Sequence, residues 1–128
     1  MNRTELENYI LNTYNARHDY PWAKFPDFEV FRHPNNKWFA LIMDLQKSKL
    51  GLSSTEMISI VNLKCSPLIM GSLTAQKGIF PAYHMNKEHW ITAALDGSVP
   101  DDELKMLVSL SYDATLPKIK SPKRPKVE

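Results

Sequence analysis

The sequence of 128 residues predicts an α+β domain in two layers, a largely antiparallel sheet with helices on one face, in the order α-β(3)-α-β(2)-α. Two observations indicate this class. Apolar residues recur at helical spacing near both ends of residues 1–116, and short apolar or alternating segments separated by turn residues lie between them. Links of hairpin length favour antiparallel pairing of the first strands, and helices on one face of the sheet complete the simplest closed core.

The first helix is expected over residues 5–17. Thr4 followed by Glu7 is typical of a capping box, and Leu6 begins a stripe of apolar residues at helical spacing. Residues 20–26, which are rich in aromatic side chains and prolines, then interrupt this spacing. We expect this connector to place its rings over one end of the core.

Three strands follow, joined by a turn and a polar loop. The strands are expected at residues 28–33, 38–45 and 57–65, with the turn at 34–37 and the loop at 46–55. The middle strand has apolar residues on both faces, which indicates a central position in the sheet.

The second half of the sequence predicts a short helix, two strands and a final helix. Ser66 is a suitable cap and Pro67 a suitable first residue for the short helix, which is expected to end at about Thr74. The final helix is expected to start at the acidic residues that follow Pro100 and to stop before Pro117. The two strands between these helices are expected at residues 79–83 and 90–95.

Composition limits the class of protein. The single cysteine, Cys65, has no partner for an intrachain disulfide, which favours a reducing compartment. No segment has the pattern of a signal peptide or enough apolar residues to span a membrane. We therefore expect a cytoplasmic protein with no membrane contact. A monomer without cofactor or metal is also expected.

Charge is unevenly distributed, although the formal net charge is only +2. Residues 117–128 hold five basic side chains, one acidic side chain and three prolines, which predicts a disordered basic tail with general affinity for polyanions. Residues 1–116, expected to form a single domain, have a slight acidic excess. Any specific function is expected to belong to this domain.

Basic and amide side chains gather at the first hairpin tip and in the loop after the next strand. Such donors are suited to phosphates, and a protruding hairpin can reach a nucleic-acid groove or backbone. The same residues also suit a solvated turn and a soluble loop, and the residues alone leave both interpretations open. The candidates are Arg32, His33, Asn35, Asn36, Lys37, Lys47 and Lys49.

A second cluster of polar and aromatic residues spans 83–90. His84 and His89 are five residues apart, which places them on neither one helical face nor one side of a strand, and no neighbouring ligand completes a metal site. The sequence contains no P-loop, G-x-S-x-G or other catalytic motif, which argues against an enzyme and leaves no catalytic candidate. A structured loop and a small-anion site that uses His84 and Lys87 are the alternatives.

Several segments together resemble the MmcQ/YjbR family of small bacterial proteins, and they cover roughly residues 1–116. The segments are Tyr20–Trp22, Phe25–Asp27, Val30–Pro34, Lys37–Ile42, Asn62–Cys65, Pro81–Trp90 and Leu95–Asp101. The resemblance implies a CyaY-like or secretion-chaperone-like fold and DNA binding by two β-hairpin wings. Carried onto this sequence, the wings are the hairpin of residues 32–38 and the region of Lys47 and Lys49. The most specific motif, with no assigned role, contributes His84, Asn86, Lys87, His89 and Trp90.

Three functional hypotheses follow. The first is a non-enzymatic protein that binds double-stranded DNA through its basic hairpins. The second is an adaptor that binds a partner protein or peptide through an exposed sheet face or an aromatic patch around Trp22, Trp38 and Trp90. The third is a site for a small molecule or anion at the polar residues of the family motif.

Overall fold

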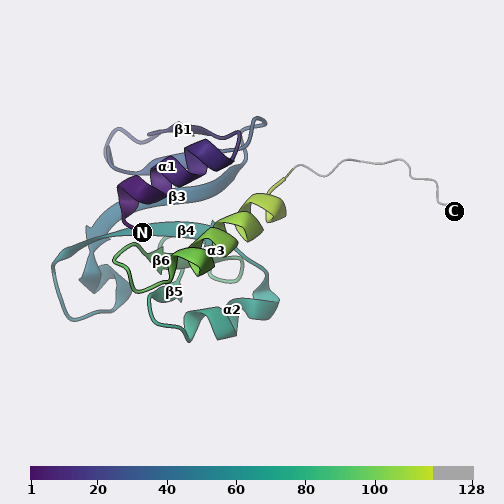
Figure 1. The fold of residues 1–128 in the computed structure, drawn as a ribbon. Coiled ribbons are helices and arrows are strands. Elements are labelled where there is room, and N and C mark those ends of the chain that lie inside the picture. The colour runs from purple at the N-terminus through teal and green to yellow at the C-terminus, as the bar shows by residue number, and fades with distance from the viewer. Residues whose placement is uncertain (117–128) are drawn as a thin grey trace, which may run out of the picture.

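Six strands and three α-helices make up residues 1–116, the part of the chain that the computed structural model describes. Their order confirms the predicted α+β class, with a short first strand and a 3-10 helix as additions (Figure 1). The predicted tail, residues 117–128, lies outside the described residues. The elements are α1 (Arg3–Thr13), β1 (Arg17–Asp19), β2 (Glu29–Arg32), β3 (Trp38–Gln46), η1 (Lys47–Leu50), β4 (Met57–Lys64), α2 (Pro67–Thr74), β5 (Ile79–Pro81), β6 (Trp90–Ala94) and α3 (Asp101–Ala114).

The strands form one antiparallel sheet in the order β1-β2-β3-β4-β6-β5. The long strands β3 and β4 lie at its centre, as the two-faced apolar pattern predicted for β3, and β1 and β5 are its edges. All three helices lie on one face, where Leu6 of α1, Leu73 of α2 and Leu107 of α3 pack into one core with the sheet (Figure 1).

The predicted start and end of the first helix are wrong. Asn2 is the N-cap: its side chain accepts the Glu5 amide, and the Glu5 side chain accepts the Asn2 amide, so the capping box lies two residues earlier than predicted. The helix ends at Thr13 because the chain then turns to form β1, in which Arg17 pairs with Arg32 of β2. A three-residue edge strand is too short to give a recognisable pattern in the sequence.

The sheet face opposite the helices is covered by side chains from loops. Trp22 of the connector and Phe28 just before β2, with Tyr83 and Met85 of the segment before β6, pack on this face. The connector rings therefore cover a sheet face, and the expectation that they cover one end of the core is wrong. The buried residues of this face are Val30, Leu41, Met43, Leu45, Ile58, Ile60 and Ala94.

A β-bulge alters the direction of side chains at the start of β3. Phe31 pairs with Ala40, whereas Arg32 pairs with Trp38, so Phe39 is an extra residue without a partner in β2. Because of this extra residue, Phe39 and Ala40 both lie in the helix-side core. Trp38 is thereby turned to the opposite face, beside Arg32.

A serine of α3 bridges the two central strands next to the bulge. The Ser111 hydroxyl donates to the Phe39 carbonyl at 2.6 Å and accepts the Lys64 amide at 2.8 Å. The ladder of β3 and β4 ends at the neighbouring pair, Ala40 and Leu63, so this fully buried hydroxyl extends the strand pairing by one position.

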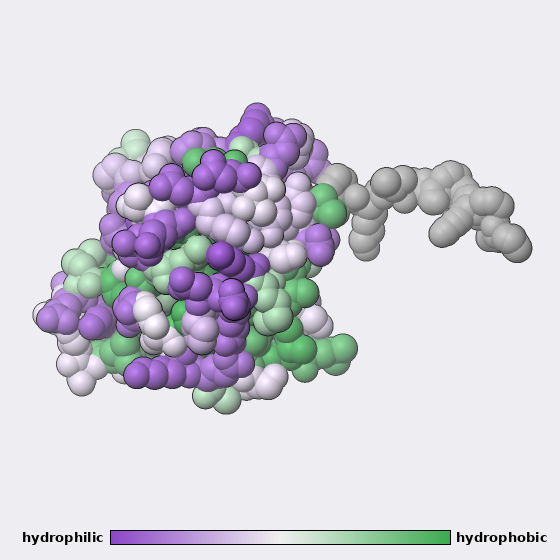
Figure 2. Space-filling model, in the orientation of Figure 1, coloured by the Kyte–Doolittle hydropathy of each residue, from purple (hydrophilic) through white to green (hydrophobic). Residues whose placement is uncertain are grey.

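Within residues 1–116, no helix is both long and apolar enough to cross a membrane. Figure 2 views the helix-covered side, where hydrophilic side chains gather over α1 and apolar side chains are exposed near α2. Leu68 of α2 is 94% exposed.

Candidate functional site

The first hairpin tip is a turn held by its own backbone and asparagines. His33 donates its amide to the Lys37 carbonyl at 2.8 Å, and the Asn36 amide donates to the His33 carbonyl at 2.9 Å. Asn36 has φ of 77°, a left-handed conformation that asparagine tolerates well, and Asn35 Oδ1 accepts the Lys37 amide. Both asparagines thus fill the structural roles of a solvated turn, while Lys37 is exposed.

His33 does not reach the surface. It is fully buried, and its ring packs between Phe39 and Tyr112 at 5.1 Å and 4.3 Å between ring centres. Its Nε2 lies 2.7 Å from Thr115 Oγ1. The prediction that His33 contacts phosphate is therefore wrong, because the chain at the end of β2 directs this side chain into the helix-side core.

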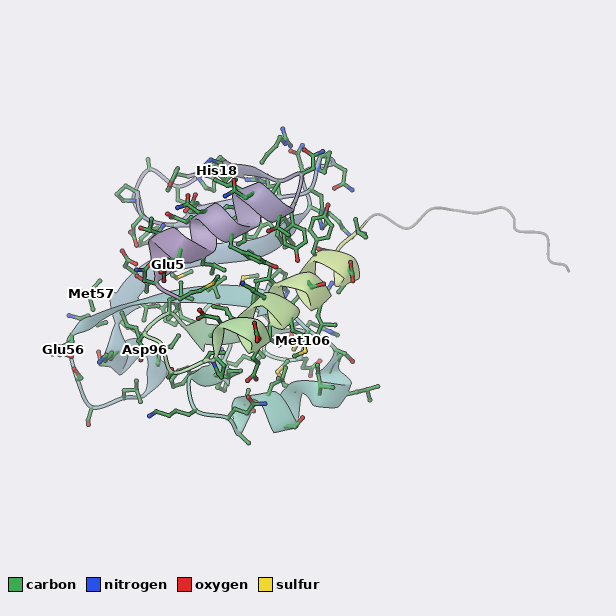
Figure 3. All side chains as sticks on the ribbon, in the orientation of Figure 1. Glu5, His18, Glu56, Met57, Asp96 and Met106 are labelled. Atoms are coloured by element: carbon green, nitrogen blue, oxygen red, sulfur yellow. The ribbon has the colours of Figure 1, made fainter. Side chains whose placement is uncertain are left out.

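The basic residues of the other predicted wing lie at the far end of β3. Lys47 and Lys49 belong to η1, after the last residue of this nine-residue strand, which spans roughly 30 Å. Figure 3 shows His18, in the strand paired with the first hairpin, near the top of the view, and Glu56, the ion-pair partner of Lys47 at 3.3 Å, at the lower left. The two predicted wings thus do not form one continuous surface.

The motif that carries the family resemblance is a loop organised by Asn86. Asn86 Oδ1 accepts the Glu88 amide at 2.8 Å, and its carbonyl accepts the Trp90 amide at 3.0 Å. The His89 carbonyl accepts the Cys65 amide at 2.8 Å, which ties the loop to the end of β4. The structured-loop interpretation therefore accounts for Asn86 and for the backbone of His89.

The loop nevertheless brings together two lysines that the sequence placed in separate clusters. Lys49 and Lys87 line a small hollow of about 200 Å³ together with Tyr83. His84, exposed and with φ of 58°, lies against the other side of Tyr83 at 4.1 Å between ring centres. Among residues 1–116, no group of three or more histidine, cysteine, aspartate or glutamate side chains is placed to hold a metal ion.

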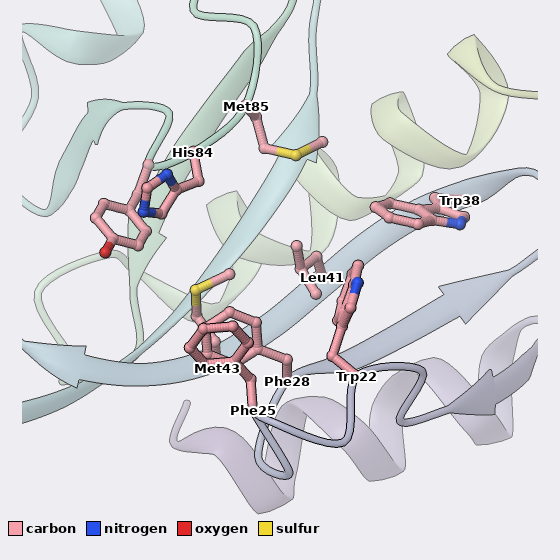
Figure 4. Close-up of a pocket in the computed structure, with 9 residues that line it drawn as sticks. Trp22, Phe25, Phe28, Trp38, Leu41, Met43, His84 and Met85 are labelled. Carbon is pink, nitrogen blue, oxygen red and sulfur yellow. The ribbon is translucent and has the colours of Figure 1, made fainter.

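An apolar concavity with a volume of about 510 Å³ lies on the sheet face opposite the helices (Figure 4). Its floor comes from β3, and its walls come from the connector and from the loop before β6. We call it the aromatic groove. It is lined by Trp22, Phe25, Phe28, Trp38, Leu41, Met43, Tyr83, His84 and Met85.

The sequence and register explain how these residues meet. Leu41 and Met43 alternate with residues that face the helices, and the bulge adds Trp38 to the same face. Trp22 packs edge-to-face on Trp38 at 5.5 Å between ring centres, and Phe25 is 50% exposed, so the groove opens to solvent.

The aromatic patch predicted around three tryptophans is partly confirmed. Trp22 and Trp38 meet in the groove, whereas Trp90 pairs with Lys64 in the sheet and does not line it. Met43 and Met85 were not predicted as parts of this surface, although the alternation along β3 carried a signal for Met43. Met85 depends on how a distant loop folds back over the sheet.

A charged network ties α1 to the sheet on the helix side. Glu29 is 1% exposed and accepts from His18 Nδ1 at 2.6 Å, while Arg3 lies 3.5 Å from its other oxygen. Burial opposes ionisation of Glu29, but hydrogen bonds from Glu7 and His18 and the charge of Arg3 lower its pKa. Burial and the neighbouring Glu29 raise the pKa of Glu7, and Arg3 opposes this shift.

An antiparallel sheet with helices on one face and an aromatic groove on the other defines a class of small α+β domains. The chain belongs to the YjbR family, whose profile matches residues 11–114. The YyaQ protein of Bacillus subtilis (strain 168) is 39% identical over 116 residues, which are 90% of this chain and 98% of YyaQ. The YjbR protein of Escherichia coli (strain K12) is 40% identical over 65 residues, or 50% of this chain and 55% of YjbR.

Solved structures agree with this assignment. A crystal structure of a Pseudomonas syringae protein has a TM-score of 0.88 and 44% sequence identity, and the match covers 91% of this chain and all of that one. A crystal structure from Deinococcus radiodurans has a TM-score of 0.66 at 24% identity, with 87% of this chain and 75% of the other covered, which supports the fold alone.

Proposed function

We propose that the protein is a non-enzymatic binding module whose aromatic groove holds an apolar segment of a partner protein. The observation that carries this proposal is the composition of the groove: seven of its nine lining residues are apolar, and only Tyr83 and His84 add titratable groups. A solvent-open surface of this kind gains free energy when apolar side chains of a partner cover it.

The residue types of the groove also match those that dominate protein interfaces. Tryptophan, tyrosine and arginine are enriched among the residues that contribute most binding energy, and Arg32 packs over Trp38 at the end of the groove, 5.7 Å from the ring centre. Met43 and Met85 supply flexible, polarisable contacts that adapt to different apolar side chains. We therefore favour an adaptor that binds a partner protein or peptide over a DNA-binding protein.

Binding of double-stranded DNA is the weaker proposal. Lys37 and Lys49 are exposed, which favours it, but they lie at opposite ends of β3. A fluorescence titration with a short duplex at low salt tests it, because phosphate contacts are strongest there. Binding that is lost on Lys37→Ala and Lys49→Ala, and kept when the groove is blocked, would favour DNA over a partner protein.

The decisive experiment selects ligands and then blocks the groove. Peptides enriched from a displayed random library on the wild-type protein are measured against Phe25→Glu, which places a charge at the half-exposed rim. The matched control is Leu68→Glu, the same kind of change on an exposed residue of α2 outside the groove. Circular dichroism melts verify that both variants fold.

We expect the selected peptides to carry large apolar side chains and to bind Leu68→Glu like the wild type. Phe25→Glu should bind them at least about tenfold more weakly, since a buried carboxylate without a partner is strongly disfavoured. Equal binding to both variants, or enrichment of no peptide at all, would overturn the proposal. A cytoplasmic location, based on the single buried thiol of Cys65, is part of the same proposal.

A further inference from the structure

A second hollow, of about 450 Å³, adjoins the Trp38 end of the aromatic groove. We call it the arginine hollow; it is lined by Arg17, His18, Asp19, Arg32 and Asn36. Arg17 of β1 pairs with Arg32 of β2, and Arg32 pairs with Trp38 of β3. Residues directly opposite one another in antiparallel strands share a face, so these three side chains form a row across the sheet.

The row places the two concavities next to each other. The Arg32 guanidinium lies 5.7 Å from the centre of the Trp38 ring, and that ring is a wall of the aromatic groove. A ligand that fills the groove next to Trp38 therefore has a guanidinium within reach.

The charges that line the arginine hollow favour an anion. Arg17 and Arg32 supply two positive charges, and Asp19 supplies the opposing negative charge. His18 directs its Nδ1 to the buried Glu29 on the helix side. Arg17 is exposed and has no ion-pair partner among residues 1–116.

The pair of Arg32 and Asp19 shows how a guanidinium in the arginine hollow binds a carboxylate. Arg32 donates to its two oxygens from Nε at 2.7 Å and from Nη2 at 3.2 Å, the two-pronged geometry that guanidinium and carboxylate prefer. The side chain of Asp19 is 45% exposed, so solvent and a ligand can both reach this pair.

We propose that the partner segment is acidic, and that one of its carboxylates binds Arg17 and Arg32 while a neighbouring apolar side chain fills the groove beside Trp38. This inference rests on the proposed function and adds the chemistry of the ligand. The row from Trp38 to Arg17 spans two strand spacings, or roughly 10 Å, which is about three residues of extended chain. The acid is therefore within about three residues of the apolar anchor.

Charge placement favours an acidic peptide over single-stranded nucleic acid. A nucleic-acid strand needs cations that follow its backbone along the stacked bases. The lining of the groove between Trp38 and Tyr83 carries no arginine or lysine, and the cations lie beyond its ends: Arg17 and Arg32 past Trp38, and Lys49 and Lys87 beside Tyr83.

The test uses two labelled peptides that share a leucine–tryptophan pair, one flanked by aspartates and the other by asparagines. Fluorescence anisotropy measures the affinity of each for the wild type, Arg17→Ala and Asp19→Asn. Lys77→Ala, which removes one exposed positive charge next to β5 at the opposite edge of the sheet, is the matched control.

We expect the aspartate peptide to bind the wild type about tenfold more tightly than the asparagine peptide, and Arg17→Ala to remove most of this difference. Asp19→Asn should tighten the aspartate peptide several-fold, because it removes a competing carboxylate, and should leave the asparagine peptide unchanged. Lys77→Ala should bind both peptides like the wild type, and higher salt should weaken only the aspartate peptide.

Failures of the two proposals are distinguishable. If both peptides bind equally and Phe25→Glu weakens both, the acidic preference is wrong and the apolar groove still stands. If neither peptide depends on Phe25, the proposed function itself fails. Displacement of the aspartate peptide by an uncharged apolar peptide supports a shared site, whereas tighter binding of oligothymidylate than of either peptide would overturn the peptide assignment.

Discussion

Replacement of Ser111 by alanine tests how the β-bulge is held in place. The Ser111 hydroxyl is the hydrogen-bond partner of both the Phe39 carbonyl and the Lys64 amide, which lie where the ladder of β3 and β4 ends. We expect Ser111→Ala to lower the free energy of unfolding by about 2–3 kcal/mol.

The magnitude follows from the two groups left without a partner. A buried donor or acceptor that loses its partner costs about 1–3 kcal/mol, and the Phe39 carbonyl lies deeper than the Lys64 amide. The gain in helix propensity from serine to alanine, roughly 0.5 kcal/mol, offsets part of the loss. The net loss is a large share of the roughly 5–15 kcal/mol that stabilises a typical domain.

Urea unfolding followed by circular dichroism measures this change, and hydrogen exchange reports separately on the Lys64 amide, which should exchange faster. The matched control is Ser72→Ala in α2, where an exposed hydroxyl bonds only to the Ile69 carbonyl. The control should change stability by less than about 0.5 kcal/mol. A loss below about 1 kcal/mol for Ser111→Ala, with unchanged protection of the Lys64 amide, would refute the reasoning.

Three further predictions concern buried groups. Burial lowers the pKa of His33, so the folded state resists protonation of this side chain. The free energy of unfolding should therefore fall as the pH drops below the unfolded-state pKa of about 6.5, by up to about 1.4 kcal/mol per pH unit. Urea unfolding of the wild type and of His33→Gln at several pH values measures this difference. Gly78→Ala should cost about 2 kcal/mol or more by thermal unfolding, because φ is +87° and a Cβ would come within 2.9 Å of Val99 Cγ2. Arg3→Met should cost about 3 kcal/mol by urea unfolding, because it leaves the buried Glu29 without its arginine.

Each of these has a control and a contradicting result. His84→Gln, which removes an exposed imidazole, is the control variant for His33→Gln. An NMR titration that gives His33 a pKa at or above 6.5 would contradict the first prediction. Gly51 has a similar φ of +85°, but no atom lies within 4 Å of the position that a Cβ would take. Gly51→Ala therefore measures the cost of the backbone strain without a steric clash. If Gly51→Ala and Gly78→Ala lower the stability equally, the clash with Val99 makes no contribution. Lys105→Met is the control for Arg3→Met, and equal losses would assign no special role to Glu29.

Local signals in the sequence predicted most of the fold. Ser66 and Pro67 placed the start of α2 correctly because cap and first-turn preferences act within a few residues. The predicted strand at residues 57–65 is observed as β4, and its side chains alternate between the two faces of the sheet, since a strand has a period of two. Such signals act between neighbouring residues and do not depend on contacts with distant segments.

The candidate site was less predictable because its parts meet through long-range pairing. Nothing near Trp38 indicates that Phe39 is an extra residue, because the bulge is defined only by pairing with β2. In the same way, the burial of His33 depends on contacts with Tyr112 and Thr115 of the last helix and its C-cap. His33 was predicted to lie with the exposed donors of the hairpin tip only because its side chain is polar.

The bulge lets the start of β3 serve both faces of the sheet. Phe39 packs in the helix-side core against His33 and Tyr112, while Trp38 faces the groove beside Arg32. Without the extra residue, regular pairing would keep Trp38 opposite Arg32 on the groove face, but the core would lose the Phe39 ring. The extra residue therefore serves packing on the helix side, whereas the wall of the groove depends on the pairing of Trp38 with Arg32.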